Sequence, residues 1–156
     1  MLSQWLKLSR PYINIYGRYE KVILDKLREI IKQQNIMKTA LDVGANIGNH
    51  TVFFSEFFEK VIALEPNPRA YFVLKMNTEN LGNVSCMRIG ASSKKTTLDF
   101  YVDDLNMGGS RIIQDHNNSS IKIDVSPLDE IESIREQSVG FVKGHLEKYS
   151  FRKFGT

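Results

Sequence analysis

Residues 39–50 run Thr-Ala-Leu-Asp-Val-Gly-Ala-Asn-Ile-Gly-Asn-His, and residues 60–68 run Lys-Val-Ile-Ala-Leu-Glu-Pro-Asn-Pro. Each segment begins with the short apolar run that is typical of a buried strand. The first strand leads into a turn with glycines at positions 44 and 48, which permit close backbone approach to a ligand. The second strand ends in Glu65, 21 residues after Gly44. Because an acid at this distance holds ribose hydroxyls in nucleotide-binding βαβ units, the two segments predict a nucleotide site.

The spacing within the turn bears on which nucleotide binds. A dinucleotide fingerprint places glycines at i, i+2 and i+5. Here position i+2 is Asn46, and the second glycine, Gly48, stands at i+4. Asp42, near the end of the first strand, would repel a pyrophosphate but would suit a cationic amino group. S-adenosylmethionine carries an ammonium and a ribose but no phosphate, so the loop favours this ligand over NAD.

Residues 42–50, followed by residues 65–68, resemble the FkbM family of S-adenosylmethionine-dependent methyltransferases. The resemblance covers about residues 19–143 and implies a class I, Rossmann-like methyltransferase fold. The usual activity in this family is O-methylation of a hydroxyl on a sugar or secondary metabolite, and we predict that activity here. The further matching positions are Asn77, Asn80, residues 90–92 and residues 125–131.

The order of predicted elements supports a doubly wound, mostly parallel sheet. Three strands alternate with helices, the last of which has Asn67 as its N-cap and Pro68 at its first position. The strand order should begin 3-2-1, with a ligand crevice at the carboxyl ends of strands 1 and 4. The expected elements are helices over 18–34, 49–58 and 67–80 and strands over 39–43, 60–64 and 83–89.

The pattern changes after Ala91. Residues 97–102 and 121–125 predict an antiparallel pair, and the loop 103–120 between them should hang over the crevice. A short helix over 128–136 and a fourth parallel strand over 138–143 should follow. The predicted fold is therefore an incomplete α/β sheet of about four parallel strands plus an antiparallel pair.

We divide the chain into an N-terminal arm (1–17), a cofactor-binding domain (18–143) and a divergent basic tail (144–156). Family members usually continue the fourth strand as Lys-Ile-Asp-x-Glu-Gly, whereas residues 143–147 here are Lys-Gly-His-Leu-Glu. We interpret the chain as truncated at its C-terminus. The alternatives are a homodimer through the exposed sheet edge or a tail that folds back, because Phe141, Phe151 and Phe154 would otherwise be poorly covered.

Composition excludes several classes of function. The net charge of +3 is small and the basic residues are scattered, which argues against nucleic acid as a partner. No apolar run approaches the ~20 residues of a membrane span, and the first residues lack the apolar core of a signal peptide. A single cysteine, Cys86, fits a buried position and a reducing compartment. We expect a cytoplasmic protein that acts on a small-molecule or glycan acceptor.

The predicted cofactor site consists of the turn, the acid and the segment after the third strand. Methyl transfer to oxygen usually needs a base, for which His50, Asp103, Asp104, His116 and His145 are candidates. Each has a simpler role in a helix cap, a solvated turn or a loop, so we assign no catalytic residue. The histidines show no metal-ligand spacing, and we predict no metal. The predicted cofactor residues are Asp42, Gly44, Ala45, Asn46, Gly48, Asn49, Glu65, Pro66 and Asn67, with Ala91 and Ser92 beside the adenine.

Two rival functions stay open at this point. The first is a domain that binds the cofactor without catalysis, either inactive or a truncated remnant, which the missing acids would explain. The second is an NAD-dependent oxidoreductase, which the glycine spacing opposes.

Overall fold

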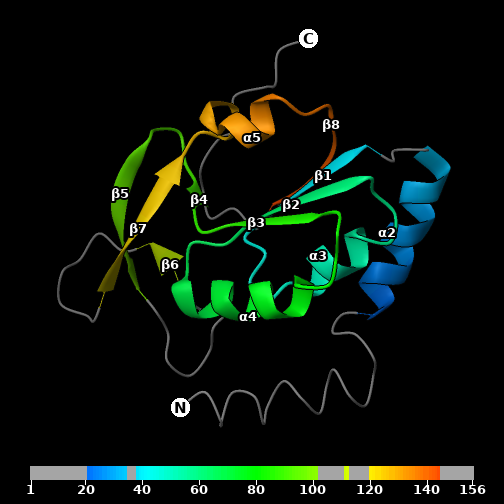
Figure 1. Ribbon diagram of the computed structural model, residues 1–156, viewed down its shortest axis with the longest axis horizontal. Coiled ribbons are helices and arrows are strands. Elements are labelled where there is room, and N and C mark those ends of the chain that lie inside the picture. Colours follow the sequence, from blue (N-terminus) through cyan, green and yellow to red (C-terminus); the bar gives the residue numbers. More distant parts are fainter. Residues whose placement is uncertain (1–20, 35–37, 102–110, 113–119, 145–156) are drawn as a thin grey trace, which may run out of the picture.

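A computed structural model describes residues 21–34, 38–101, 111–112 and 120–144, and Figure 1 shows their arrangement. The central feature is a sheet with the strand order β3-β2-β1-β8. All of its neighbouring strands run parallel, as predicted. This order confirms that the last strand lies beside the first, which places the expected crevice between them. The strands are β1 (Thr39–Val43), β2 (Lys60–Leu64), β3 (Val84–Met87) and β8 (Val139–Gly144).

Helices cover both faces of this sheet, so the fold is doubly wound. Leu24 of α2 and Phe53 of α3 cluster with Ala40 and Val61, while Leu74 of α4 clusters with neighbouring residues of the same face. On the opposite face, α5 and the 3-10 turn η2 pack on β1 and β2. Figure 1 shows α4 and α3 below the sheet and α5 above it. The helices are α2 (Lys21–Gln34), α3 (Asn49–Phe54), α4 (Pro68–Thr78), η2 (Leu128–Glu130) and α5 (Glu132–Arg135).

The sheet's core explains why β1 and β2 are apolar runs without alternation. Every residue of β1 is buried, since side chains on both of its faces meet helices. The predicted aromatic pairs are present, with ring centroids 5.0 Å apart for Phe53–Phe57 and 5.9 Å for Phe54–Phe58. Phe141 of β8 packs against Phe54 and Phe58 at 5.2 and 5.6 Å and is half-buried. Our expectation that Phe141 would be poorly covered was therefore wrong.

The buried face of helix α2 matches the expected one only in part, since Leu27 and Ile31 pack on the core but Ile23 and Ile30 do not. The sequence suggested a stripe of Ile23, Leu27, Ile30 and Ile31. In the structure Leu24 and Ile31 are buried, whereas Ile23 and Ile30 are each 51% exposed. Residues 24 and 31 are seven apart and lie on one face, and residues 23 and 30 form a parallel row about 100° away.

Two other predicted helices were too long or too regular. Helix α3 ends at Phe54. The backbone amides of Glu56 and Phe57 donate to carbonyls three residues back, and the Ser55 hydroxyl donates to the Val52 carbonyl at 2.7 Å. The segment 128–136 forms η2 and α5, which are separated by the extended backbone of Ile131. Three residues of this segment, spaced three positions apart in the sequence, are buried in one cluster, and this spacing matches the three residues per turn of a 3-10 helix. They are Leu128, Ile131 and Ile134.

A second sheet has the order β4-β7-β5-β6 and lies to the left in Figure 1. Its antiparallel β5–β7 pair confirms the predicted antiparallel pair. Two short strands were not predicted: β4 pairs parallel with β7, and β6 pairs with β5 inside the segment expected to be a loop. The rest of that loop, with Asp103, Asp104 and His116, lies outside the described residues. The strands are β4 (Gly90–Ala91), β5 (Thr96–Tyr101), β6 (Arg111–Ile112) and β7 (Ser120–Ser126).

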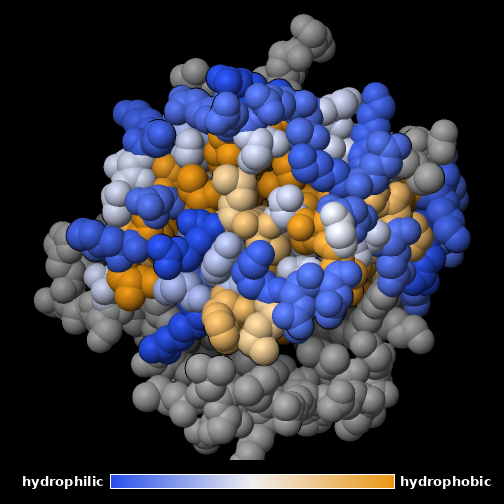
Figure 2. Space-filling model, viewed as in Figure 1, coloured by the Kyte–Doolittle hydropathy of each residue, from blue (hydrophilic) through white to orange (hydrophobic). Residues whose placement is uncertain are grey.

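The predicted arm (1–17) lies outside the described residues, as do residues 145–156 of the predicted tail. Gly144 belongs to β8, so the domain's last strand extends one residue beyond its expected end. Figure 2 shows hydrophobic surface over β3 and α4 on the viewed face. On α4, Phe72 and Met76 are 59% and 58% exposed. In the part of the chain that the structure describes, no helix combines the length and apolar character of a membrane span.

Candidate functional site

The turn after β1 is held in one conformation by its own backbone. Gly44, Asn46 and Gly48 have positive φ angles of 74°, 51° and 92°. The amides of Gly44 and Ala45 both donate to the Leu64 carbonyl, at 2.9 and 3.0 Å. The end of β1 is thereby fixed to the end of β2. Asparagine and glycine tolerate positive φ, which explains their use in this turn.

Gly48 has a packing role that the sequence did not reveal. A Cβ at this position would lie 2.7 Å from Cδ1 of Leu74, a fully buried residue of α4. The side-chain amide of Asn77, in the same helix, donates to the Ile47 carbonyl at 2.7 Å. Helix α4 therefore supports the turn from behind, and Gly48 allows the close contact.

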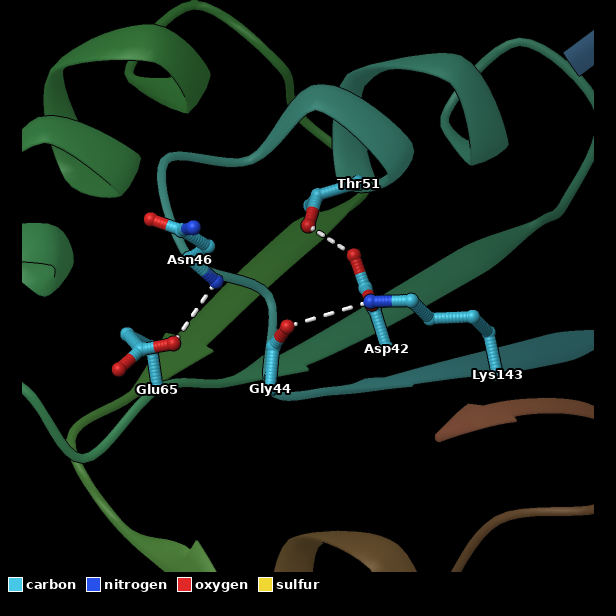
Figure 3. A network of polar contacts seen from close by, with 6 residues as sticks. All are labelled: Asp42, Gly44, Asn46, Thr51, Glu65 and Lys143. Carbon is cyan, nitrogen blue, oxygen red and sulfur yellow. Dashed lines mark hydrogen bonds and ion pairs between the residues drawn. The ribbon is translucent and has the colours of Figure 1, made fainter. Parts of the chain in front are cut away.

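Glu65 lies directly after β2 and faces the turn. Its Oε2 accepts a hydrogen bond from the backbone amide of Asn46 at 2.7 Å (Figure 3). Its Oε1 accepts one from the backbone amide of Asn67 at 2.8 Å. Burial raises the pKa of the Glu65 carboxyl, against the lowering effects of these two amides and of the Lys143 charge; the Asp42 charge raises it slightly further. Each carboxylate oxygen keeps a second lone pair that can accept a ligand hydroxyl.

The residues around Glu65 are held by packing and capping. Asn67 is the N-cap of α4, as predicted, and its Oδ1 accepts the Arg69 amide at 3.0 Å. Pro66 lies beside Gly90, where an added Cβ would be 3.6 Å from it. The segment 90–92, which we expected to border adenine, therefore begins next to the Glu65 turn. The Ser92 amide already donates to the Ser126 carbonyl at 3.0 Å.

Asp42 contacts residues of its own chain. It is fully buried, and its Oδ2 accepts the Thr51 hydroxyl at 2.7 Å. The Lys143 ammonium lies 2.9 Å from Oδ1 as an ion pair and donates a hydrogen bond to the Gly44 carbonyl at 3.2 Å (Figure 3). The sequence analysis expected Asp42 to suit a cationic ligand, but here Lys143 provides the cation.

Lys143 is a site residue that the sequence analysis missed. Strands β1 and β8 pair in parallel with Asp42 opposite Lys143. The predicted strands and their order contained the signal, since the last residues of adjacent parallel strands lie side by side. Their register was the missing information.

Asn46 provides the clearest open hydrogen-bonding position in the described part of the site. Its Oδ1 is buried and accepts no hydrogen bond from the described residues. The same is true of Asp42 Oδ1, but that oxygen has the Lys143 ammonium beside it at 2.9 Å. An acceptor such as Asn46 Oδ1 is uncommon in a folded protein and indicates that a donor comes from elsewhere. The backbone amide of the same residue donates to Glu65, so Asn46 is part of the turn that contacts this carboxylate.

The catalytic candidates gain little from the structure. His50 is in the first turn of α3, and its ring centroid lies 6.0 Å from that of Phe54. Asn49, a predicted cofactor residue, begins the same helix and is half-buried. Asp103, Asp104, His116 and His145 lie outside the described residues. No catalytic base is assigned.

Together these groups form a site at the point where the chain order reverses, between β1 and β8. The turn separates a carboxylate, Glu65, from an ammonium, Lys143, which is itself paired with Asp42. The carboxylate can accept hydroxyls, and the positive-φ turn presents backbone to a ligand. This combination suits the sugar of a nucleoside.

No protein-family model matches the chain, and no curated protein matches it. Among the solved structures that resemble it are the following two. One, from Anaeromyxobacter dehalogenans, is described as a candidate type II methyltransferase, with 20% identity and a TM-score of 0.33 over 47% of this chain and 35% of its own. The other is a DhpI–SAH complex, with 14% identity and a TM-score of 0.41 over 84% of this chain and 78% of its own.

This chain spans about a third of the length of the first of these structures. Both TM-scores are below 0.5, so neither likeness bears on the site. The α/β assignment follows from the parallel strand order and the helices on both faces. The resemblance to the FkbM family stays a prediction.

Proposed function

We propose that this chain binds S-adenosylmethionine at the turn after β1 and is a class I methyltransferase. The observation that carries the proposal is the Glu65 carboxylate, held against the turn by the Asn46 and Asn67 amides. These amides fix its orientation and leave lone pairs for the two ribose hydroxyls of a nucleoside. The buried Asn46 Oδ1, which accepts no hydrogen bond from the described residues, adds an acceptor in the same turn.

Asn46 also distinguishes this ligand from a dinucleotide. In the dinucleotide fingerprint the second glycine lets the backbone approach the pyrophosphate. Asn46 stands at that position and carries a side chain. A ligand without phosphate avoids this conflict.

The second candidate is an NAD-dependent oxidoreductase, and one observation favours it. Asp42 was expected to repel a pyrophosphate, but it is paired with Lys143 at 2.9 Å. The charge objection to NAD is thereby weakened, although the steric objection at Asn46 stands. NAD must therefore be tested beside S-adenosylmethionine.

The proposal extends to the acceptor of the methyl group. Following the resemblance to the FkbM family, we propose O-methylation of a hydroxyl on a sugar or secondary metabolite. Such a transfer needs the hydroxyl in line with the methyl group and a base near it. A chain that binds the cofactor but methylates no hydroxyl acceptor would instead be a binding domain without catalysis.

The first test is calorimetric titration of the purified chain with S-adenosylhomocysteine and, separately, with NAD. We expect saturable binding of S-adenosylhomocysteine and none of NAD. Glu65→Ala should weaken that binding by about 1–3 kcal/mol, because the ribose hydroxyls lose their acceptor. Gly44→Val should abolish it, because a branched side chain is strained at φ 74° and blocks the backbone.

A matched control is Glu79→Ala, which removes an exposed carboxylate at the other end of α4. Its affinity should equal that of the wild type. Wild-type affinity in Glu65→Ala would contradict the site assignment. Binding of NAD without S-adenosylhomocysteine would replace the proposal with the oxidoreductase.

A further inference from the structure

The Asp42 carboxylate is enclosed by its own chain. None of its side chain is exposed, whereas the Lys143 side chain is 22% exposed. Thr51 and Lys143 lie 2.7 and 2.9 Å from its two oxygens. The Asp42 carboxylate therefore presents no exposed surface to a cation arriving from solvent, and Lys143 occupies the place of its counter-ion.

The fold fixes Lys143 in this place. Lys143 lies opposite Asp42 in the parallel β1–β8 pairing, and its ammonium donates to the Gly44 carbonyl of the turn. A buried carboxylate that loses its counter-ion is strongly destabilised, so the pair resists separation. The ammonium of a bound ligand would therefore meet another ammonium at the end of β1, which is unfavourable.

We propose that Lys143 is the permanent counter-ion of Asp42 and determines specificity at the methionine end of the ligand. The ammonium of S-adenosylmethionine then adds little to its affinity, and the nucleoside supplies most of the recognition. The inference rests on the proposed function, since it concerns the other end of the same ligand.

The test compares S-adenosylhomocysteine with its desamino analogue, which keeps the nucleoside and the carboxylate and lacks only the amino group. Both are titrated calorimetrically into the wild type, Lys143→Ala and Lys143→Arg. The quantity compared is the ratio of their dissociation constants. Lys122→Ala is the matched control, because Lys122 is also ion-paired, to Asp99 at 3.2 Å in the second sheet.

The wild type should prefer S-adenosylhomocysteine by less than about tenfold, since Asp42 is already neutralised. In Lys143→Ala the preference should rise by at least about tenfold, because the ligand's ammonium can now pair with Asp42. Lys143→Arg keeps the positive charge and should keep the wild-type ratio. Lys122→Ala should keep it as well.

A larger preference in the wild type, or a smaller rise in Lys143→Ala, overturns the inference. The wild-type ratio alone decides if Lys143→Ala does not fold. If both ligands bind but the ratio of their dissociation constants differs from the expected one, Lys143 does not have the proposed role, and the proposed function is unaffected. If neither ligand binds the folded wild type, the proposed function fails, and the role of Lys143 fails with it.

Discussion

Glu65 shows how a single buried acid links folding to pH. Burial raises the pKa of its carboxyl above the ordinary 4.5, so the folded chain holds this proton more tightly than the unfolded chain does. The stability gained from that proton is fully present below the ordinary pKa and is lost as the pH rises through the raised pKa. Ionisation of Glu65 in the folded chain therefore costs stability relative to a carboxyl with the ordinary pKa.

We expect the difference in unfolding free energy between the wild type and Glu65→Gln to shift in favour of the wild type as the pH falls from 7.5 to 4. Glutamine does not titrate, so subtracting the unfolding free energy of Glu65→Gln from that of the wild type removes the contribution of the other acids. Urea unfolding of both proteins across this range measures the difference. A difference that is constant, or that favours the wild type more at high pH, would contradict the raised pKa of Glu65.

Gly48 tests whether the turn is limited by space as well as by backbone angle. Gly48→Ala should lower the unfolding free energy by about 1–2 kcal/mol or more, because alanine is strained in the left-handed region. Its Cβ would also meet buried Leu74 at 2.7 Å. Gly82→Ala is the control, since an added Cβ there meets nothing within 4 Å. It should be neutral or stabilise the fold, and equal losses in both variants would refute the packing role.

Among the elements, α4 links the sheet to the site. Its N-cap, Asn67, makes this link. Asn67 caps the helix through the Arg69 amide, and its own amide donates to Glu65. We expect Asn67→Ala to cost about 0.5–2 kcal/mol of unfolding free energy. Asn67→Ser retains a capping oxygen and should lose less. Thermal or urea unfolding of the two variants makes the comparison, and equal losses would show that the cap is unimportant.

Sequence patterns predicted the elements well where one physical signal dominated. The apolar runs of β1 and β2 are buried on both faces, and their predicted bounds match the structure. The Asn67-Pro68 cap was also confirmed. The end of α3 was misplaced because the aromatic spacing continues through Phe57 and Phe58, after the helix has become a tight turn. The spacing of packed side chains does not predict where the helical hydrogen-bond pattern of the backbone ends.

At the scale of the whole molecule, the site depends on contacts that local sequence does not encode. Asn46 of the turn and Glu65 are 19 residues apart, and their spacing predicted that the turn and the acid belong to one nucleotide site. In the structure the Asn46 backbone amide donates to the Glu65 carboxylate. Asp42 and Lys143 are about a hundred residues apart and meet only through the register of β1 and β8. A sequence pattern could suggest the pairing of these strands but not which residues stand opposite.

The second sheet has its own small core, and this division predicts how the molecule opens. Phe100, Ile123 and Val125 form a buried cluster that is distinct from those on the parallel sheet. Regions with small cores open at lower free energy than the global transition. Amide hydrogen exchange should therefore be faster in residues 96–101 and 120–126 than in residues 39–43 and 60–64.

Two core substitutions test this division. Phe100→Ala should accelerate hydrogen exchange in β5 and β7 and leave β1 and β2 unchanged, because the cavity lies in the smaller core. Phe53→Ala, at a fully buried position of the parallel sheet's core, should cost about 3–5 kcal/mol and accelerate exchange throughout the described strands. Exchange measured by mass spectrometry on peptides from each strand distinguishes the two patterns. If Phe100→Ala accelerates β1 and β2 as much as β5 and β7, the two sheets unfold as one cooperative unit. The turn, Glu65 and Lys143 would then depend on the second sheet for their stability, although no described contact of the Asp42–Lys143 pair reaches that sheet.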